Sequence, residues 1–227
     1  MNSGTSAEVA VFSALLGPGD EIIIPRDVYG GTYRLLKNEY ERWGVVIRTV
    51  DLTDTEALAA AITDRTAIVW AETPSNPGLD VIDIVETARI AHAHNALLAV
   101  DSTFATPYLQ RPIELGADLV IHSTTKFING HSDVIGGAVL AGAGRTCSRA
   151  AEVIDRLTSH FASVGLGISP FDAWLTRRGI KTLPVRMAAH CANAQAVAEW
   201  LEHVRRSPRC TIPGCPRTRA MRSRRPR

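Results

Sequence analysis

Residues 82–101 read IDIVETARIAHAHNALLAVD, a sequence that places a helical segment directly before a short apolar one. The pattern predicts a helix over residues 82–95 and a buried strand over residues 96–100, which ends at Asp101. A helix of this length followed by an almost wholly apolar strand is the unit that builds a parallel sheet covered by helices. The stretch therefore indicates an α/β fold.

The same alternation continues on both sides of this stretch. Short apolar or β-branched runs predict further strands, and segments with helical spacing predict helices between them. The predicted strands are residues 21–25, 45–50, 67–70, 119–122 and 134–140, and the predicted helices are residues 6–16, 32–42, 54–62 with Thr53 as N-cap, and 187–201. We expect a mostly parallel sheet with helices on both faces.

The composition is that of a soluble globular protein. Of the 227 residues 45% are hydrophobic and 21% are charged, and this length fits one domain with a fragment of a second. No apolar run reaches the roughly 18 residues of a membrane span and no signal peptide follows Met1, so we expect a cytoplasmic protein without a membrane partner. The four cysteines are irregularly spaced and predict neither a disulfide framework nor a metal site.

Basic residues are concentrated at the C-terminal end. Residues 204–227 hold nine arginines and no acidic residue. The rest of the chain therefore has 16 basic and 23 acidic residues. Such a tail could bind nucleic acid, but it lacks interleaved aromatic residues and a recognisable fold. We therefore expect no nucleic-acid partner.

Polar residues gather just after the predicted strands. They occupy residues 27–29, 72–76, 101–103 and 122–126. In open parallel sheets ligands bind beyond the carboxyl ends of the strands, so we expect these residues to meet at one site.

Lys126 is the candidate nucleophile of this site. It is one of only three lysines and follows a predicted strand and the polar residues 122–125, whereas Lys37 and Lys181 have the setting of surface residues. A lysine at the mouth of a buried strand can be partly desolvated, which lowers its pKa and makes its amine a nucleophile for a carbonyl cofactor. From spacing alone, a solvated surface lysine stays open as the alternative.

Other residues suggest a phosphate-bearing aromatic cofactor. Asp101 could pair with a pyridinium nitrogen, or cap a turn. Residues 3–5, Ser-Gly-Thr, open a helix whose backbone amides suit a phosphate, although a plain N-cap is the alternative. Ser123 and Thr125 could add hydroxyl donors to the same phosphate. Tyr29, beside two glycines, could stack on a flat ring or simply occupy a turn.

Together these segments resemble the Cys/Met-metabolism, or transsulfuration, family of pyridoxal 5′-phosphate (PLP) enzymes. Similar motifs occur there in the same order: SGTSA at 3–7, VYGGTY at 28–33, ETPSNP at 72–77, DSTFATP at 101–107 and HSTTKFINGHSD at 122–133. The likeness continues through SPFDA at 169–173 and RGIKTL at 178–183, and it covers about residues 2–203.

The resemblance implies the large domain of an aspartate-aminotransferase-like (fold type I) enzyme with PLP as cofactor. By it, Lys126 forms the Schiff base with PLP, Asp101 pairs with the pyridine nitrogen, and Tyr29 stacks on the ring and assists the leaving group. The other residues implied to bind the cofactor are Gly4, Thr5, Ser123 and Thr125 at the phosphate, Asn76 near the ring hydroxyl, and Thr103.

The implied activity is γ-replacement or γ-elimination on homoserine-derived or sulfur amino acids. Residues 30–32, Gly-Gly-Thr, lack the cysteine typical of methionine γ-lyases, and the sequence looks closer to the cystathionine γ-synthases and γ-lyases. The alternatives are an O-acylhomoserine sulfhydrylase, a methionine γ-lyase, or an inactive PLP-binding remnant. The family also implies a homo-oligomer, a dimer of dimers.

The resemblance sets the expected domain limits as well. Residues 1–186 are similar to the PLP-binding large domain, and residues 187–203 to the start of a linker helix. Residues 204–227 are interpreted as a frameshifted tail, because the back-translated tail resembles the family in another reading frame. The family's upstream Tyr-x-Arg segment and its C-terminal domain have no counterpart here, so we expect a truncated copy with impaired activity.

Overall fold

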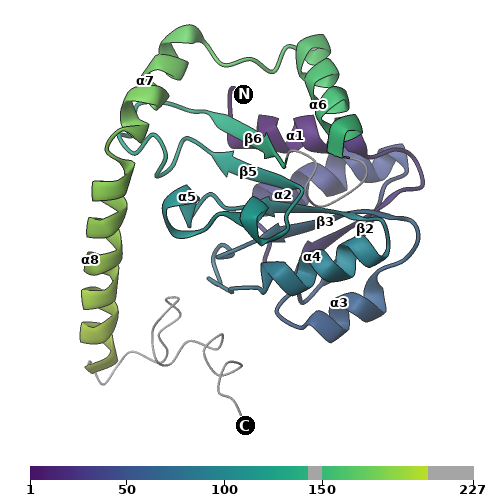
Figure 1. Ribbon diagram of the computed structural model, residues 1–227, viewed down its shortest axis with the longest axis horizontal. Coiled ribbons are helices and arrows are strands. Elements are labelled where there is room, and N and C mark those ends of the chain that lie inside the picture. Colours follow the sequence, from purple (N-terminus) through teal and green to yellow (C-terminus); the bar gives the residue numbers. More distant parts are fainter. Residues whose placement is uncertain (143–149, 204–227) are drawn as a thin grey trace.

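The structure is a computed structural model that describes residues 1–142 and 150–203 (Figure 1). The tail expected at residues 204–227 lies outside the described residues. Within them, one sheet has the strand order β2-β1-β3-β4-β5-β6. The strands are β1 (Glu21–Pro25), β2 (Val46–Val50), β3 (Thr66–Glu72), β4 (Leu97–Asp101), β5 (Leu119–Ser123) and β6 (Gly137–Ala141). Neighbouring strands are parallel except β5 and β6, which confirms the mostly parallel sheet.

Helices cover both faces of the sheet, as expected (Figure 1). The α-helices of the described residues are α1 (Gly4–Leu15), α2 (Gly30–Leu35), α3 (Thr55–Ala61), α4 (Ile84–Ala93), α5 (Thr106–Leu109), α6 (Ala150–Val164), α7 (Pro170–Ile180) and α8 (Leu183–His203). Shorter helical turns are η1 (Leu36–Tyr40), a π-helix, and the 3₁₀ helices η2 (Glu41–Trp43) and η3 (Pro112–Leu115). Helices α1 and α6 pack on one face, and α3 and α4 pack on the other.

The alternation of side chains along the strands creates a core on each face. In β1, Ile22 and Ile24 point into the core shared with α1, whereas Ile23 points into the core under α3 and α4. Trp70 of β3 is fully buried in the first core and packs edge-on against Phe12 of α1, with 4.9 Å between the ring centroids. Because both faces are covered, each central strand is apolar on both sides.

The register of the parallel strands brings their carboxyl ends together. Glu72, the last residue of β3, pairs with Asp101, the last residue of β4, and Ser123 ends β5. The polar residues that follow these strands therefore meet at one edge of the sheet, as expected.

Several expected boundaries differ from the structure, among them the start of β6, which is Gly137 rather than residue 134. The N-cap of α3 is Asp54 rather than Thr53, because the Asp54 carboxylate accepts hydrogen bonds from two N–H groups of the first turn. Residues 32–42 do not form one regular helix: α2 gives way to η1 and η2, which end at Gly44 with a φ of 88°. Helix α8 begins at Leu183, earlier than expected.

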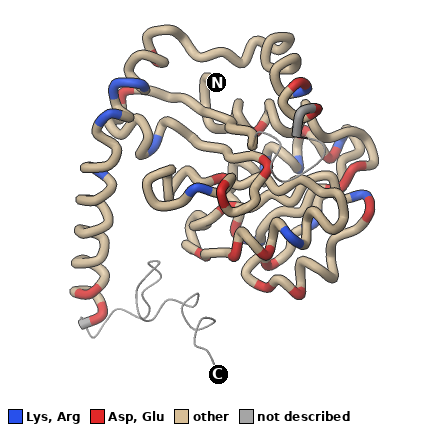
Figure 2. The backbone as a smooth tube through the Cα atoms, in the orientation of Figure 1, with Lys and Arg blue, Asp and Glu red and all other residues tan. Residues whose placement is uncertain are grey.

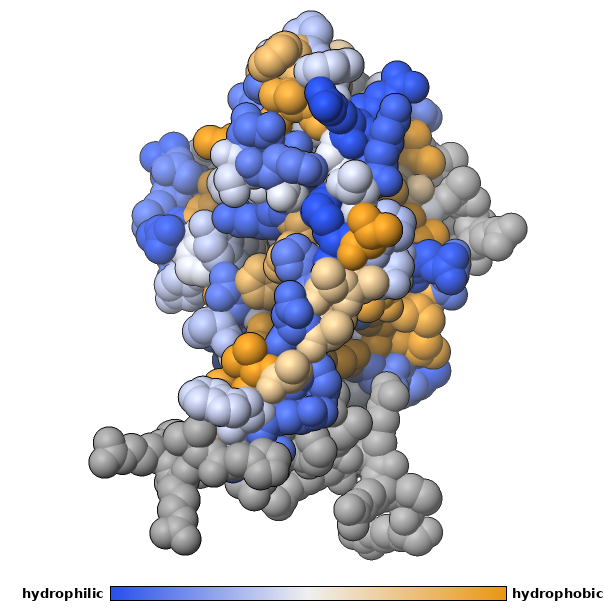
Figure 3. Space-filling model, turned by 90° about the vertical axis from the view of Figure 1, so that its left-hand side faces the viewer, coloured by the Kyte–Doolittle hydropathy of each residue, from blue (hydrophilic) through white to orange (hydrophobic). Residues whose placement is uncertain are grey.

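Helices α7 and α8 run along one side of the molecule, away from the sheet (Figure 1). No charged residue occurs between residues 187 and 198 of α8, and Figure 2 shows charges only near its two ends. Figure 3 shows apolar side chains on this face. Large apolar residues exposed on the two helices include Phe171, Trp174, Val185, Val197 and Trp200. Among the described helices, none is long and apolar enough to cross a membrane.

Candidate functional site

A cavity of about 370 Å³ lies at the carboxyl ends of β3, β4 and β5. Its lining contains every residue predicted for the site: Gly4, Thr5, Tyr29, Asn76, Asp101, Thr103, Ser123, Thr125 and Lys126. The other lining residues are Ser3, Glu8, Glu72, Pro74, Phe104 and Ile135. The fold therefore brings to one place residues that lie more than 100 positions apart in the sequence. In the described residues, no cluster of His, Cys, Asp and Glu is arranged to hold a metal ion.

The first turn of α1 forms one part of the cavity. Ser3 caps the helix, since its hydroxyl accepts a hydrogen bond from the N–H of Ser6 at 2.9 Å. Within the described residues, the N–H groups of Gly4 and Thr5 have no hydrogen-bond acceptor. Gly4 also lies directly against Ser123, because a Cβ added to Gly4 would lie 2.8 Å from the Ser123 Cβ. Free N–H groups at a helix N-terminus, beside a serine hydroxyl, suit a phosphate or another anion.

Asp101 supplies a carboxylate to the cavity. Its Oδ1 accepts a hydrogen bond from the N–H of Thr103 at 2.9 Å, and the Thr103 Oγ1 accepts one from the N–H of Ser123 at 2.8 Å. These two bonds tie the loop after β4 to the end of β5. Desolvation raises the pKa of Asp101, although the bonds from Thr103 act in the opposite direction. A carboxylate in this setting is stabilised as the anion when a cationic ring nitrogen binds to it.

Glu72 positions Tyr29 at the cavity. The N–H of Tyr29 donates to Glu72 Oε2 at 2.7 Å. The ring of Tyr29 folds over its own chain, and a Cβ on Gly31 would lie only 2.2 Å from it. Tyr29 remains 44% exposed, so its ring is available to pack against a ligand. Burial raises the pKa of Glu72 to about 8, and the charges of Asp101 and Asp27 add to this effect.

Glu8 was not among the site residues predicted from the sequence. This residue is buried, belongs to the otherwise largely apolar α1, and lines the cavity. Its Oε1 accepts a hydrogen bond from the Thr32 hydroxyl at 2.8 Å, whereas its buried Oε2 has no partner among the described residues. Burial raises the pKa of Glu8 to about 7. The hydrogen bond from Thr32 acts to lower this pKa, and the charge of Asp101 raises it by a smaller amount. The available signal was an isolated acidic residue one helical turn after Gly4.

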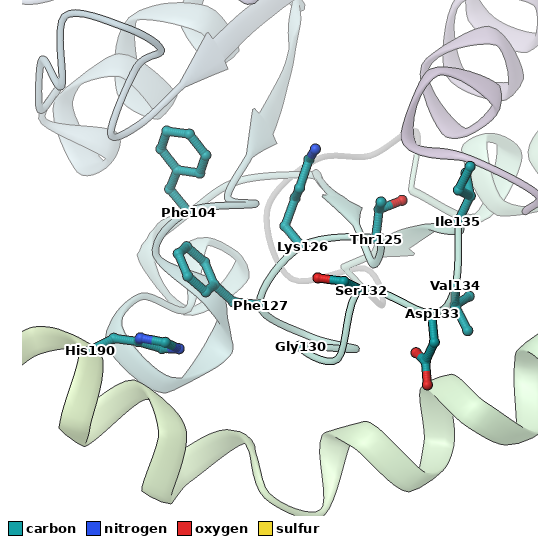
Figure 4. Close-up of a pocket in the computed structure, with 10 residues that line it drawn as sticks. All are labelled: Phe104, Thr125, Lys126, Phe127, Gly130, Ser132, Asp133, Val134, Ile135 and His190. Atoms are coloured by element: carbon teal, nitrogen blue, oxygen red, sulfur yellow. The ribbon is translucent and has the colours of Figure 1, made fainter.

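Lys126 lies in the turn that follows β5. Its N–H donates to the carbonyl of Ser123 at 3.3 Å, and its carbonyl accepts from the N–H of Gly130 at 2.8 Å. Lys126 also lines a second cavity of about 690 Å³, which extends to Phe127 and to His190 of α8. Figure 4 shows Lys126 pointing away from α8, and the ring of Phe127 lies near His190, with 5.2 Å between the ring centroids.

The hydroxyl of Thr125 is already engaged within the protein. It accepts a hydrogen bond from the N–H of Gly136 at 3.0 Å and donates one to the Gly136 carbonyl at 3.2 Å. Thr125 therefore holds the segment before β6 at the edge of the cavity. Of the two hydroxyls predicted to contact an anion, that of Ser123 is the better placed, because it lies beside Gly4.

Comparison with known proteins identifies the family. Residues 1–222 match the family described as Cys/Met metabolism PLP-dependent enzyme. The chain is 46% identical over 212 residues to a cystathionine β-lyase of Lactococcus lactis subsp. cremoris, which covers 93% of this chain and 53% of that protein. It is 46% identical over 204 residues to a cystathionine γ-synthase of Mycobacterium tuberculosis, and this match covers 88% of this chain and 50% of that protein. The crystal structure of cystathionine γ-lyase from Lactobacillus plantarum complexed with L-serine matches with a TM-score of 0.84 and 40% identity, covering 89% of this chain and 51% of that one.

The chain therefore belongs to the Cys/Met-metabolism family of PLP-dependent enzymes. The structural likeness confirms the expected large-domain fold of this class. The chain spans about half the length of the curated relatives it matches. These relatives include a cystathionine β-lyase, an activity that was not among those expected from the sequence.

The cavity fits the cofactor that defines the family. PLP carries a phosphate, an aldehyde and a pyridine nitrogen. The cavity offers the free N–H groups of Gly4 and Thr5, the amine of Lys126 and the carboxylate of Asp101. Its volume of about 370 Å³ lies in the range of small-molecule sites.

Proposed function

We propose that this chain forms the cofactor-binding part of a PLP-dependent transsulfuration enzyme that acts on a homoserine-derived or sulfur amino acid. The observation that carries the proposal is the shared cavity of Lys126, Asp101 and Tyr29 with the first turn of α1. The candidate reactions are γ-replacement and γ-elimination. Because the chain is similar to a cystathionine β-lyase, β-elimination is a further candidate. PLP, when bound, supplies an electron sink for carbanions that form on the substrate.

The residues at the ring have distinct proposed roles. Lys126 would bind the aldehyde carbon through its amine and later move protons at the substrate carbons. Asp101 would accept a hydrogen bond from the ring nitrogen and stabilise its positive charge. Tyr29 would stack on the ring, with its backbone held by Glu72, and Asn76 would lie near the ring hydroxyl.

The phosphate would bind at the start of α1. The N–H groups of Gly4 and Thr5 and the hydroxyl of Ser123 support this assignment. Thr103 and Thr125 are proposed to contribute mainly by fixing the surrounding loops, because their hydroxyls already bond to the backbone.

Reductive labelling tests the assignment of Lys126. Protein incubated with PLP and then treated with borohydride should carry the cofactor on the peptide that contains Lys126, identified by mass spectrometry. Lys126→Arg should abolish the label, whereas Lys37→Arg should leave it unchanged, since Lys37 lies on the surface in a pair with Glu41. A label on Lys37 or Lys181 would contradict the proposal.

Asp101 should affect chemistry more than binding. Asp101→Asn keeps the side-chain volume but removes the charge that stabilises the ring nitrogen. We expect turnover to fall by about 100-fold or more, while PLP affinity falls much less. Asp64→Asn, at a fully exposed site, is the matched control and should change neither. Unchanged turnover in Asp101→Asn would remove the role proposed for this carboxylate.

Product analysis separates the candidate activities. With water, cystathionine would give homocysteine, pyruvate and ammonia by β-elimination, but cysteine, 2-oxobutyrate and ammonia by γ-elimination. A synthase would instead form cystathionine from an acylated homoserine and cysteine, and a sulfhydrylase would use the same acceptor with sulfide. Labelling of Lys126 without any of these products would favour the alternative of an inactive PLP-binding protein. The homo-oligomer and the cytoplasmic location stay predictions.

A further inference from the structure

Arg186, in the first turn of α8, binds the backbone directly after Lys126. Its Nη1 donates to the carbonyl of Phe127 at 2.6 Å, and its Nη2 donates to the carbonyl of Ile128 at 3.2 Å. The same guanidinium also donates to the carbonyl of Gly179 at 2.9 Å and to the Thr182 hydroxyl at 3.0 Å. One side chain therefore joins the end of α7, the start of α8 and the lysine turn.

Two glycines allow this close approach. A Cβ on Gly130, whose φ is 78°, would lie 1.9 Å from Arg186 Nη1. A Cβ on Gly179 would lie 2.2 Å from the carbonyl oxygen of Asn129. The α7–α8 junction therefore packs so closely against the turn at residues 127–130 that a side chain at Gly130 or Gly179 would clash.

Among the described residues, the lysine turn is also held by bonds to the end of β5, by a bond within the turn, and by the Asn129 side chain, which donates to the Asp133 carboxylate at 2.7 Å. The N–H of Asn129 donates to the carbonyl of Thr124 at 3.0 Å, and the N–H of Gly130 donates to the carbonyl of Lys126 at 2.8 Å. The ring of Phe127 adds one further contact to α8, with its centroid 5.2 Å from that of His190. Phe127 also contacts Phe104, with 6.4 Å between the ring centroids, so α8 is one of several supports of the turn, and its hydrogen bonds to the Phe127 and Ile128 carbonyls come from Arg186.

We propose that Arg186 is a positioning residue that couples α8 to Lys126 and fixes the direction in which the amine enters the cofactor cavity. The inference deepens the proposed function and rests on it for the role of Lys126. A guanidinium has a rigid fork of donors that can bind several carbonyls at once, which the single ammonium of lysine cannot reproduce. Arg186→Lys should therefore behave more like Arg186→Ala than like the wild type.

The first test needs no cofactor. In Arg186→Ala, hydrogen exchange at the amides of Asn129 and Gly130 should rise by about tenfold or more, while exchange in β4 stays unchanged. Labelling of Lys126 by an amine reagent should increase relative to Lys37 in the same molecule. Arg178→Ala is the matched control, because Arg178 is exposed on α7 and lies over the ring of Trp174 at 5.8 Å. Equal increases in the turn and in β4 would show a general loss of stability and overturn the inference.

The second test uses PLP and chemical rescue. Arg186→Ala should form the borohydride-stable label on Lys126 more slowly than the wild type, and millimolar guanidinium should restore part of the rate, whereas Arg178→Ala should need no rescue. An unchanged labelling rate in Arg186→Ala would overturn the positioning role. Absence of the label from the wild type would instead count against the proposed function, and the exchange measurements would still decide whether Arg186 holds the turn.

Discussion

Helices α4 and α8 contact the rest of the protein in different ways. Half of α4 is buried, with Ile84, Ala88 and Ile90 packed in the core under the sheet. In the much longer α8, Leu183, Met187 and Ala198 are the buried apolar residues, whereas Trp200 is 65% exposed. Apart from the exposed Val85, the large apolar residues of α4 lie on one stripe that matches the sheet, but those of α8 are spread around the helix.

The difference shows that two kinds of interaction hold this molecule together. Burial of apolar surface stabilises the sheet and the helices that cover it. The described contacts of α8 lie mainly near its start, where Arg186 binds the lysine turn and His190 packs against Phe127. The position of α8 therefore depends on a few directional contacts, and these lie next to the candidate site.

The largest expected effect compares two tryptophans. Trp70→Ala should lower the free energy of unfolding by about 3–5 kcal/mol, because it leaves a cavity in a closely packed core beside Phe12. Trp200→Ala should change it by less than about 0.5 kcal/mol, because this side chain is largely exposed on α8. Urea unfolding of both variants gives the comparison. Similar losses would mean that α8 is part of the same core.

A smaller effect concerns pH and Glu8. Burial raises the pKa of Glu8 from 4.5 to about 7, so the folded protein favours the neutral carboxyl. The resulting stability is fully present below about pH 4.5 and is lost as the pH rises through about 7, by roughly 3 kcal/mol. Glu8→Gln cannot ionise and should keep that stability at alkaline pH.

Urea unfolding across this pH range checks the Glu8 prediction. The difference between Glu8→Gln and the wild type should grow as the pH rises from about 4.5 to above 7. Glu114→Gln is the control, since that side chain is 61% exposed and should follow the wild-type curve. Parallel curves for Glu8→Gln and the wild type would mean that Glu8 is not held neutral by the fold.

The smallest effect compares two helix caps. Asp83 caps α4 by accepting a hydrogen bond from the N–H of Glu86 at 3.1 Å, and Ser169 caps α7 by accepting one from Asp172 at 3.1 Å. Asp83→Ala should lower the global free energy of unfolding by about 1 kcal/mol, because α4 unfolds together with the core. Ser169→Ala should mainly increase hydrogen exchange in the first turn of α7. Equal global losses would place α7 in the same cooperative unit as α4.

Most of the fold and of the candidate site was predictable from the sequence, for physical reasons that are local. The strands are continuous apolar runs because both faces of the sheet are covered, and the polar residues follow them because the strands end at one edge. The motif around Lys126 led to its neighbours in the cavity through the family resemblance. Glu8 was missed because it lies inside an apolar helix, where only the direction of its side chain shows that it reaches the cavity.

The sequence by itself determined the α/β class, the order of the strands along the chain, and the residue types needed for a PLP site, since these depend on periodicity and short motifs. Only the tertiary structure decided which hydroxyls are already engaged, as for Thr125 with Gly136, and that three acidic residues share one cavity. It also decided that Arg186 reaches the turn after Lys126 from a distant helix. Such contacts depend on how elements pack in three dimensions, and sequence spacing carries no record of that packing.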